Sequence, residues 1–337
     1  MTGVQTCALP IWFETRAVAD YEAPEESELS AYPSFYLDLD YAHSNSELEI
    51  DLEFRPEYLD REEDAREFAQ ELVDEAYLTL FYDRFSLEAG LIREVWGTGD
   101  QVHVVDTLNS NDLRDFVNPD YAERRLARPM VKVNVPVRSQ GRFEAVYLPT
   151  FEPDLIPREG RWAPAQASQL TALVQGAAAA ASAAGAGSPY EIALAAEEAI
   201  VEPETNTLKW GQYAARYRDT FGPVDLGVSY YHGFLKQPSV ELVLDNVADP
   251  QTELTLQERF DLGDKILLDY DRVNIFAVEY AAVPAGFNTR AEVAYYLTDD
   301  IAGDDPAVTN NSVQYLAGFD RDLPLSNLNV NIQGVGT

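Results

Sequence analysis

Two stretches of strict alternation, joined by a short polar turn, dominate residues 34–55 of the sequence. They read SFYLDLDYA and ELEIDLEFR, and the turn between them reads HSNS. In both stretches apolar side chains alternate with mostly acidic ones, and a period of two indicates β-strands. The segment is therefore predicted to form an antiparallel hairpin with one apolar face and one acidic face. Such a hairpin suits a soluble sheet packed on a core, or a membrane barrel whose apolar face meets lipid.

Further hairpins with the same kind of alternation follow along the chain. They are predicted at residues 75–95, 129–149, 207–233, 272–298 and 312–332. Connections within hairpins span about two to five residues, which is the usual range for hairpin loops. Connections between hairpins are long, namely residues 56–74, 96–128, 150–206, 234–271 and 299–311. Short and long connections thus alternate, as they do on the two rims of a transmembrane barrel.

The fold class predicted from these hairpins is all-β, an up-and-down antiparallel transmembrane β-barrel. About 12 strands are expected, each of about 9–11 residues, which crosses a bilayer when tilted. Aromatic residues near the strand ends, such as Tyr41, Tyr147 and Tyr230, fit interfacial girdles. The chain stops directly after a strand, and an unpaired edge has no water to bond in lipid. We therefore expect a barrel fragment that lacks some of its strands.

The first twelve residues, MTGVQTCALPIW, resemble translated sequencing-adapter read-through and are set aside as an artefact. Residues 13–33 are taken as an N-terminal segment, and residues 34–337 as the barrel fragment. The only cysteine, Cys7, lies in the part that is set aside. Disulfides and cysteine-based chemistry are therefore excluded from the rest of the chain.

Two of the long connections are predicted to contain helices. Residues 62–76 place Ala65, Phe68 and Leu72 at helical spacing, which indicates a short amphipathic helix. Residues 162–202 are rich in alanine, carry no charge between Arg161 and Glu191, and are interrupted near Gly185. Alanine, glycine and serine supply too little transfer free energy for a spanning helix. A helical hairpin that caps or plugs the barrel mouth is expected instead.

The charge balance and the histidines exclude several classes of function. Acidic residues number 58 against 24 basic ones, a net charge of −34 that would repel nucleic acid. His43, His103 and His232 are isolated and lack metal-ligand spacing, so no metal or cofactor is predicted. No catalytic residue is assigned, and Ser229 near His232 is the only local pair that a hydrolase could use.

Charged residues form two candidate sites in the predicted lumen. The first is the connection 96–128, whose candidates are Asp106, Asp112, Arg114, Arg124, Arg125 and Arg128. The second is the acidic face of the first hairpin, with candidates Asp38, Asp40, Glu49 and Asp51. The connection either narrows the pore with opposed charges, or its charges pair and hold it in place. Since like charges across strands repel, Arg114, Arg124 or Arg125 is expected to neutralise part of the acidic face.

A series of short pieces after residue 86 carries a resemblance to a known family. They are Gly90 with Trp96-Gly97, Asp106, NSNDLR at 109–114, RRLARPM at 124–130, FEP at 151–153 and WAP at 162–164. These pieces resemble a family of large proteobacterial outer-membrane proteins, catalogued as domain of unknown function 1302. Its usual Asn-Pro-Arg-Asp stands here as Asn-Ser-Asn-Asp. The resemblance implies an outer-membrane β-barrel with a transport role that includes apolar compounds, and it supplies no catalytic residues.

The sequence therefore predicts a porin-like channel or facilitator for small solutes in the bacterial outer membrane, with the lipid bilayer as its partner and no enzymatic activity. Cationic or neutral solutes are expected to be preferred. Two alternatives stay open: a soluble or surface-exposed β-rich binding or structural protein, and an outer-membrane hydrolase. The first differs from the channel in one observable respect, because its apolar rows would be covered by a second layer of protein.

Overall fold

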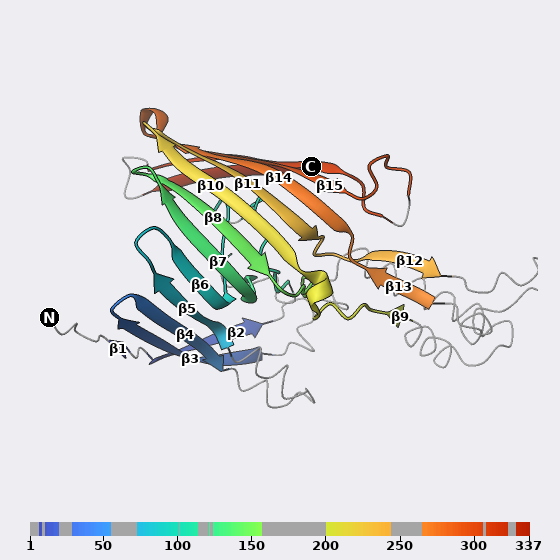
Figure 1. Ribbon diagram of the computed structural model, residues 1–337, viewed down its shortest axis with the longest axis horizontal. Coiled ribbons are helices and arrows are strands. Elements are labelled where there is room, and N and C mark those ends of the chain that lie inside the picture. Colours follow the sequence, from blue (N-terminus) through green and yellow to red (C-terminus); the bar gives the residue numbers. More distant parts are fainter. Residues whose placement is uncertain are drawn as a thin grey trace, which may run out of the picture.

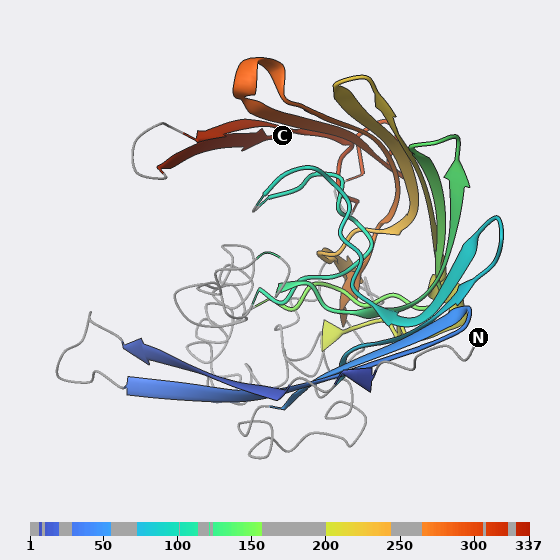
Figure 2. The same cartoon turned by 90° about the vertical axis from the view of Figure 1, so that its left-hand side faces the viewer.

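The computed structural model describes residues 7–8, 11–19, 29–54, 73–100, 102–113, 121, 124–156, 200–243, 265–305, 308–322 and 328–337. These residues form a 14-stranded sheet and a separate three-stranded sheet. The larger sheet is a single layer that curves around an interior space (Figures 1 and 2). Its first half contains β1 (Cys7–Ala8), β2 (Ile11–Ala19), β3 (Leu29–His43), β4 (Ser46–Phe54), β5 (Val73–Phe81), β6 (Ser86–Ile92) and β7 (Arg128–Val137). Its second half contains β8 (Gly141–Leu148), β10 (Gln212–Phe221), β11 (Val224–Phe234), β14 (Arg272–Ala282), β15 (Asn288–Thr298), β16 (Ser312–Asp322) and β17 (Asn329–Gly336).

The strand order confirms the up-and-down topology. From β3 to β17 each strand of the large sheet pairs antiparallel with the next one, so the twelve expected strands are present. The remaining two, β1 and β2, pair with the other edge of β3 in one continuous register, Cys7 opposite Tyr41 and Ile11 opposite Leu37. They include part of the segment that was set aside as an artefact, and the origin of that segment stays a prediction.

The sheet is open in this structure, so a closed barrel is not observed. Among the described residues, β17 pairs only with β16, and β2 pairs only with β3 (Figure 2). The curvature of a barrel is therefore present without the final pairing of its edges.

Connection lengths sort between the two rims as predicted. The turn rim carries short links at residues 44–45, 82–85, 138–140, 222–223 and 283–287, the last containing the 3₁₀ turn η4 (Pro284–Gly286). The loop rim, at the opposite end of the strands, carries the long connections (Figure 1). In the two-residue turn between β10 and β11, Gly222 has a φ of 65°, a conformation that glycine adopts without a steric penalty.

Apolar rows face outward and are bare. Val228, Val278, Val293 and Tyr315 lie directly opposite one another on β11, β14, β15 and β16, and are 52%, 51%, 48% and 52% exposed. The register of 273–283, ambiguous in the sequence, is settled by the structure, since Ile275 is buried on the inner side. Within the described residues no second layer covers these rows, so the sandwich arrangement is not observed.

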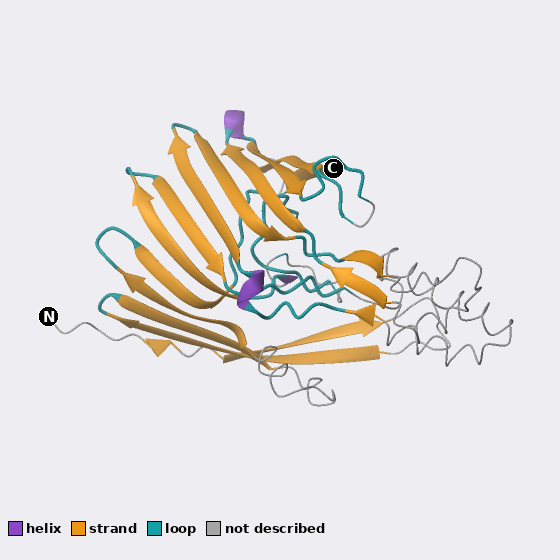
Figure 3. Cartoon of the chain, turned by 45° about the vertical axis from the view of Figure 1, so that its right-hand side comes forward, coloured by secondary structure: helices purple, strands orange, loops and turns teal. Residues whose placement is uncertain are grey.

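The predicted helices fall mostly outside the described residues, namely at 62–72 and 157–199. Where their ends are described, the prediction is wrong, because residues 73–76 belong to β5 and residues 200–201 form β9 (Ile200–Val201). The second of these strands joins β12 (Ser239–Val243) and β13 (Lys265–Asp269) in a small sheet beside the loop rim that was not predicted (Figure 3). No helix in the described part of the chain is both long and apolar enough to cross a membrane.

Candidate functional site

The connection between β6 and β7 turns into the space enclosed by the sheet (Figure 2). The first described portion of this connection, residues 93–113 without residue 101, is called the inner loop below. Trp96 and Leu108 of this loop are completely buried, and they share a hydrophobic cluster with Ile275 and Ala277 of the wall. The apolar core thus lies inside the curve, where the inner loop packs against β8 to β16.

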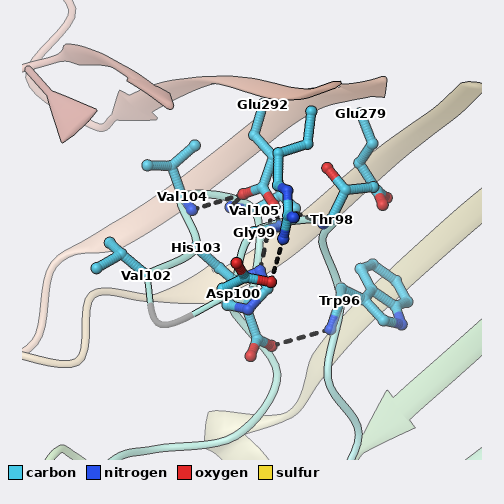
Figure 4. Close-up of polar contacts among 12 residues, drawn as sticks. Trp96, Thr98, Gly99, Asp100, Val102, His103, Val104, Val105, Glu279 and Glu292 are labelled. Atoms are coloured by element: carbon cyan, nitrogen blue, oxygen red, sulfur yellow. Dashed lines mark hydrogen bonds and ion pairs between the residues drawn. The ribbon is translucent and has the colours of Figure 1, made fainter. Parts of the chain in front are cut away.

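One carboxylate holds the middle of the inner loop (Figure 4). Glu292 of β15 faces inward, and its side chain is fully buried. Its Oε1 accepts the backbone N–H groups of Thr98 at 2.6 Å and Gly99 at 2.8 Å, and lies 3.2 Å from His103 Nδ1. Its Oε2 accepts the N–H groups of Val104 at 2.8 Å and Val105 at 3.4 Å. Several backbone donors from one loop converge on a single anion, so the loop is folded around this side chain.

A second set of contacts ties the loop to the far end of the sheet. Asp100 forms an ion pair with Arg290 of β15 and accepts a hydrogen bond from Asn331 of β17. Gln333 Nε2 donates to the carbonyl of Val102 at 2.9 Å. The inner loop therefore spans from β6, where it begins, to β17.

The base of the inner loop is built around Asp106 and Arg125. Arg125 Nη2 lies 2.7 Å from Asp106 Oδ1, and the Tyr121 hydroxyl donates to Asp106 Oδ2 at 2.8 Å. Burial raises the pKa of Asp106, although the neighbouring Arg125 guanidinium and Tyr121 hydroxyl act in the opposite direction. Asn109 Nδ2 donates to the carbonyls of Ile92 and Leu126, each at 2.8 Å. These bonds close the two ends of the connection onto each other.

The wall behind the loop carries alternating charges. Arg216 of β10 lies between Glu144 and Glu279, and its Nε is 3.4 Å from a carboxylate oxygen of each. Its Cζ lies 5.2 Å from the centre of the Trp96 ring. Gly227 makes room for this arrangement, because a Cβ there would lie 3.0 Å from Glu279 Oε1. Farther along the wall, Lys132 lies 2.7 Å from Glu88. Lys132 also pairs with Glu94, so each of these two cations is shared by two carboxylates and the inner wall is net acidic at both places.

The loop candidates from the sequence are only partly brought together. Asp106 and Arg125 meet, Arg128 pairs with Glu152, and Asp112 joins the backbone bridges that link 111–113 to 124–125 and 155. Arg124 lies 5.8 Å from the Tyr121 ring centre. Arg114 lies outside the described residues. Arg125 is committed to Asp106 and Arg124 lies beside Tyr121, so neither is seen to neutralise the acidic face of the first hairpin. Because Arg114 is not described, the expectation that one of the three arginines does so stays a prediction.

The acidic face is retained as a strip on β3 and β4. Asp38 lies opposite Asp51, and Asp40 lies opposite Glu49, so like charges face each other across the two strands. The Tyr77 hydroxyl donates to Glu49 at 2.5 Å. A cavity of about 370 Å³ opens over this strip and is lined by Asp40, Glu47, Glu49, Tyr77 and Glu88, among others. Among the described residues, no lysine or arginine forms an ion pair with Asp38, Asp40, Glu49 or Asp51.

The residues that hold the loop from the opposite wall were missed by sequence reasoning. Alternation placed Arg290 and Glu292 on the inner face, but it gives no information about a partner more than 180 residues away along the chain. Asn331 and Gln333 carry no sequence signal beyond their inward parity.

The structure also separates the pair that a hydrolase would need. Ser229 and His232 are three residues apart on β11, so they face opposite sides of the sheet. His232 stacks on Tyr213 and lies 3.0 Å from Asn274. In the described part of the chain, no cluster of three His, Cys, Asp or Glu side chains is arranged to hold a metal ion.

A curved antiparallel sheet with bare apolar rows outside, buried charges inside and connections sorted by rim defines the class of outer-membrane β-barrel proteins. The chain belongs to the family described as protein of unknown function DUF1302, whose profile matches residues 40–326. This confirms the resemblance seen in the sequence.

Solved structures of outer-membrane proteins are similar to the chain at low identity. OmpT of Vibrio cholerae, a trimer, has a TM-score of 0.44 and 10% identity, covering 99% of this chain and 79% of that one. An anion-selective porin of Comamonas acidovorans has a TM-score of 0.43 and 8% identity, with coverages of 98% and 78%. OmpF of Salmonella typhi, in complex with daunomycin, has a TM-score of 0.43 and 11% identity, with coverages of 96% and 76%. No curated protein matches the chain.

Proposed function

We propose that the chain forms a porin-like channel that lets small cationic or neutral solutes, apolar compounds included, cross the bacterial outer membrane. The observation that carries this proposal is the sorting of side chains by face. The outward row through Val228, Val278 and Val293 is bare, whereas Glu144 and Arg216 on the inner face are buried and paired. Such a sheet is stable when lipid covers its outside and water or protein fills its inside.

In the membrane both edges of the sheet need partners. The outer edges of β2 and β17 carry backbone N–H and C=O groups that the described residues leave unpaired. In the hydrocarbon region no water satisfies such groups, and each costs several kcal/mol, roughly, when unpaired. A barrel in lipid therefore requires these two edges to be paired, with each other or with further strands.

The inner loop and the acidic strip together determine what passes. The inner loop narrows the bore from the side of β15 to β17, where Glu292 and Arg290 hold it. On the β3–β4 side, Asp38, Asp40, Glu49 and Asp51 contribute negative charge that no described cation offsets. A one-signed strip on a low-dielectric wall raises the local concentration of cations.

Reversal potentials test this selectivity. The chain is reconstituted in planar bilayers with a tenfold salt gradient. We expect a cation preference that weakens in the double variant Asp40→Asn, Glu47→Gln. Arg142→Gln, which removes a half-exposed cation from the inner face of β8, serves as the matched control and should strengthen the preference. Clear anion preference in the wild-type chain would overturn the proposed selectivity, and absence from the outer-membrane fraction would overturn the channel itself.

A further inference from the structure

A second cavity, of about 330 Å³, lies at the loop rim and is called the rim cavity. Its lining residues come from the ends of β10, β11, β13, β14 and β15 and their connections: Lys209, Trp210, Phe234, Asp269, Tyr270, Asp271, Arg272, Asp299 and Val308. The cavity is separate from the inner loop and the acidic strip, and none of its residues takes part in the contacts described above.

Aromatic rings form the apolar wall of the rim cavity. Trp210 and Phe234 have ring centres 4.5 Å apart, and both pack against Phe151 behind them, at 5.8 Å and 5.3 Å. Tyr270 meets the Phe151 ring edge-on at 5.0 Å. The 3₁₀ turn η3 (Leu208–Trp210) places Trp210 in this cluster directly before β10 begins. The wall is therefore rigid and aromatic before any ligand arrives.

Charges of both signs surround the same cavity without neutralising each other. Arg272 stacks over the Phe234 ring at 4.7 Å. Asp271 is fixed by the Ser239 hydroxyl at 3.1 Å and the Thr309 N–H at 2.9 Å. Among the described residues, neither Lys209 nor Arg272 forms an ion pair with Asp269, Asp271 or Asp299. In a chain with a net charge of −34, cations that stay unpaired beside carboxylates are available to a ligand.

We propose that the rim cavity binds small zwitterionic molecules with an aromatic or apolar body, of the size and type of an aromatic amino acid. The ligand's carboxylate meets Arg272 and Lys209, its ammonium meets Asp299 and Asp269, and its ring packs on Trp210 and Phe234. The volume lies at the lower end of the range for small-molecule pockets, and apolar walls with a few converging polar groups are typical of them. Stacked rings also favour a nearby cation.

This assignment rests on the proposed channel, for which it names one class of solute, captured at the loop-rim mouth before passage. Zwitterions carry no net charge, so they are compatible with a lumen that disfavours anions. A molecule with only one of the two charges would leave half of the polar groups of the cavity unused.

Calorimetric titration of the refolded full chain in detergent micelles tests the assignment with three probes that share one ring. L-phenylalanine carries both charges, phenethylamine only the ammonium, and 3-phenylpropanoate only the carboxylate. We expect saturable binding of phenylalanine that is about tenfold tighter than that of either relative, since a factor of ten needs only about 1.4 kcal/mol.

Charge variants at the cavity assign each group. Arg272→Gln should remove the advantage of phenylalanine over phenethylamine, and Asp299→Asn its advantage over 3-phenylpropanoate. Asp225→Asn, on an exposed turn-rim residue far along the strand, is the matched control and should change nothing. Both test variants keep the aromatic cluster, so a folded protein is expected, and circular dichroism verifies it.

Equal affinities for the three probes, or no saturable binding of phenylalanine to the folded chain, would overturn the assignment. A chain that conducts ions in bilayers but does not bind phenylalanine would retain the channel and lose this site. A chain that binds phenylalanine but fails to conduct ions would retain this site and overturn the proposed channel.

Discussion

Replacing Glu292 is expected to release the inner loop from the wall. The side chain is fully buried and receives backbone N–H groups from Thr98, Gly99 and Val104 at 2.6–2.8 Å. Hydrogen bonds to a charged group contribute roughly 1.5–3 kcal/mol each, and unsatisfied buried donors add a further cost. Glu292→Gln keeps one acceptor oxygen but turns an amide N–H₂ toward the donors on the other side. Because the amide can turn its oxygen toward Thr98 and Gly99, the variant loses at least the short bond from Val104, which costs about 1.5–3 kcal/mol of loop anchoring.

Backbone hydrogen exchange measures this change directly. A loss of about 1.5–3 kcal/mol corresponds to roughly 10- to 100-fold faster exchange of the amides in the inner loop. Single-channel recordings should show a larger and noisier conductance in the same variant, because the released segment no longer narrows the bore. The contacts of Asp100 with Arg290 and Asn331 remain, so the loop is expected to stay attached at its tip.

Glu279→Gln is the matched control. Glu279 lies directly opposite Glu292 on the neighbouring strand, is equally buried, and pairs with Arg216 rather than with loop amides. It removes the same charge and should leave loop exchange nearly unchanged. If Glu292→Gln and Glu279→Gln altered the hydrogen exchange of the inner loop equally, or if neither altered it, the hydrogen bonds to Glu292 would not be what holds the loop.

Two further predictions concern stability. Burial lowers the pKa of Lys236 to about 7, so the unfolded chain binds more protons than the folded one between about pH 7 and pH 10, and stability should rise with pH across that window. Lys236→Met should flatten this rise in thermal melts, and it removes a 3.3 Å hydrogen bond to the Leu108 carbonyl and a cation–π contact with Phe151 at 5.3 Å. An unchanged slope would show that Lys236 is not its source. Val278→Arg, in the middle of the bare outward face, should destabilise the folded protein in lipid by roughly 2–4 kcal/mol, whereas Val224→Arg, which has the same outward parity at the turn rim, should cost about 0–1. Urea titrations in vesicles measure both, and equal effects would argue against lipid on that face.

The strand topology could be predicted because alternation is a local property. Each hairpin carries its own period of two, and the parity of Val228 or Tyr295 follows from the residues beside it. The turns could be predicted in the same way, since glycine and proline in Gly222-Pro223 and Pro284-Ala285-Gly286 indicate a turn. Strand 273–283 was the exception, because the buried inner loop makes both of its faces apolar around Ile275.

The sequence identified the inner loop as part of the candidate site, but it did not identify the residues that the loop contacts. Its charges identified the segment, but the partner of each charge depends on tertiary approach. Arg125 could have met the acidic strip on sequence grounds, and the fold instead places it on Asp106 within the same connection. Glu292 and Asn331 act on a loop that lies 187 or more residues earlier, a relation that no local pattern encodes. The small sheet of β9, β12 and β13 was missed for a similar reason, since its strands are short and come from two different connections.

Glu292 fixes a loop that comes much earlier in the sequence, and this separation imposes an order on the folding of the chain. Thr98 and Glu292 are separated by 194 positions, so the carboxylate that fixes the inner loop is synthesised long after the loop itself. Until β15 pairs with the sheet, the loop has no anion to fold around, and nothing offsets the entropic cost of closing it. With only the earlier hairpins in place, the middle of the inner loop therefore lacks the carboxylate that holds it, and it can be fixed to the wall only after β15, the twelfth strand of the large sheet in chain order, has joined.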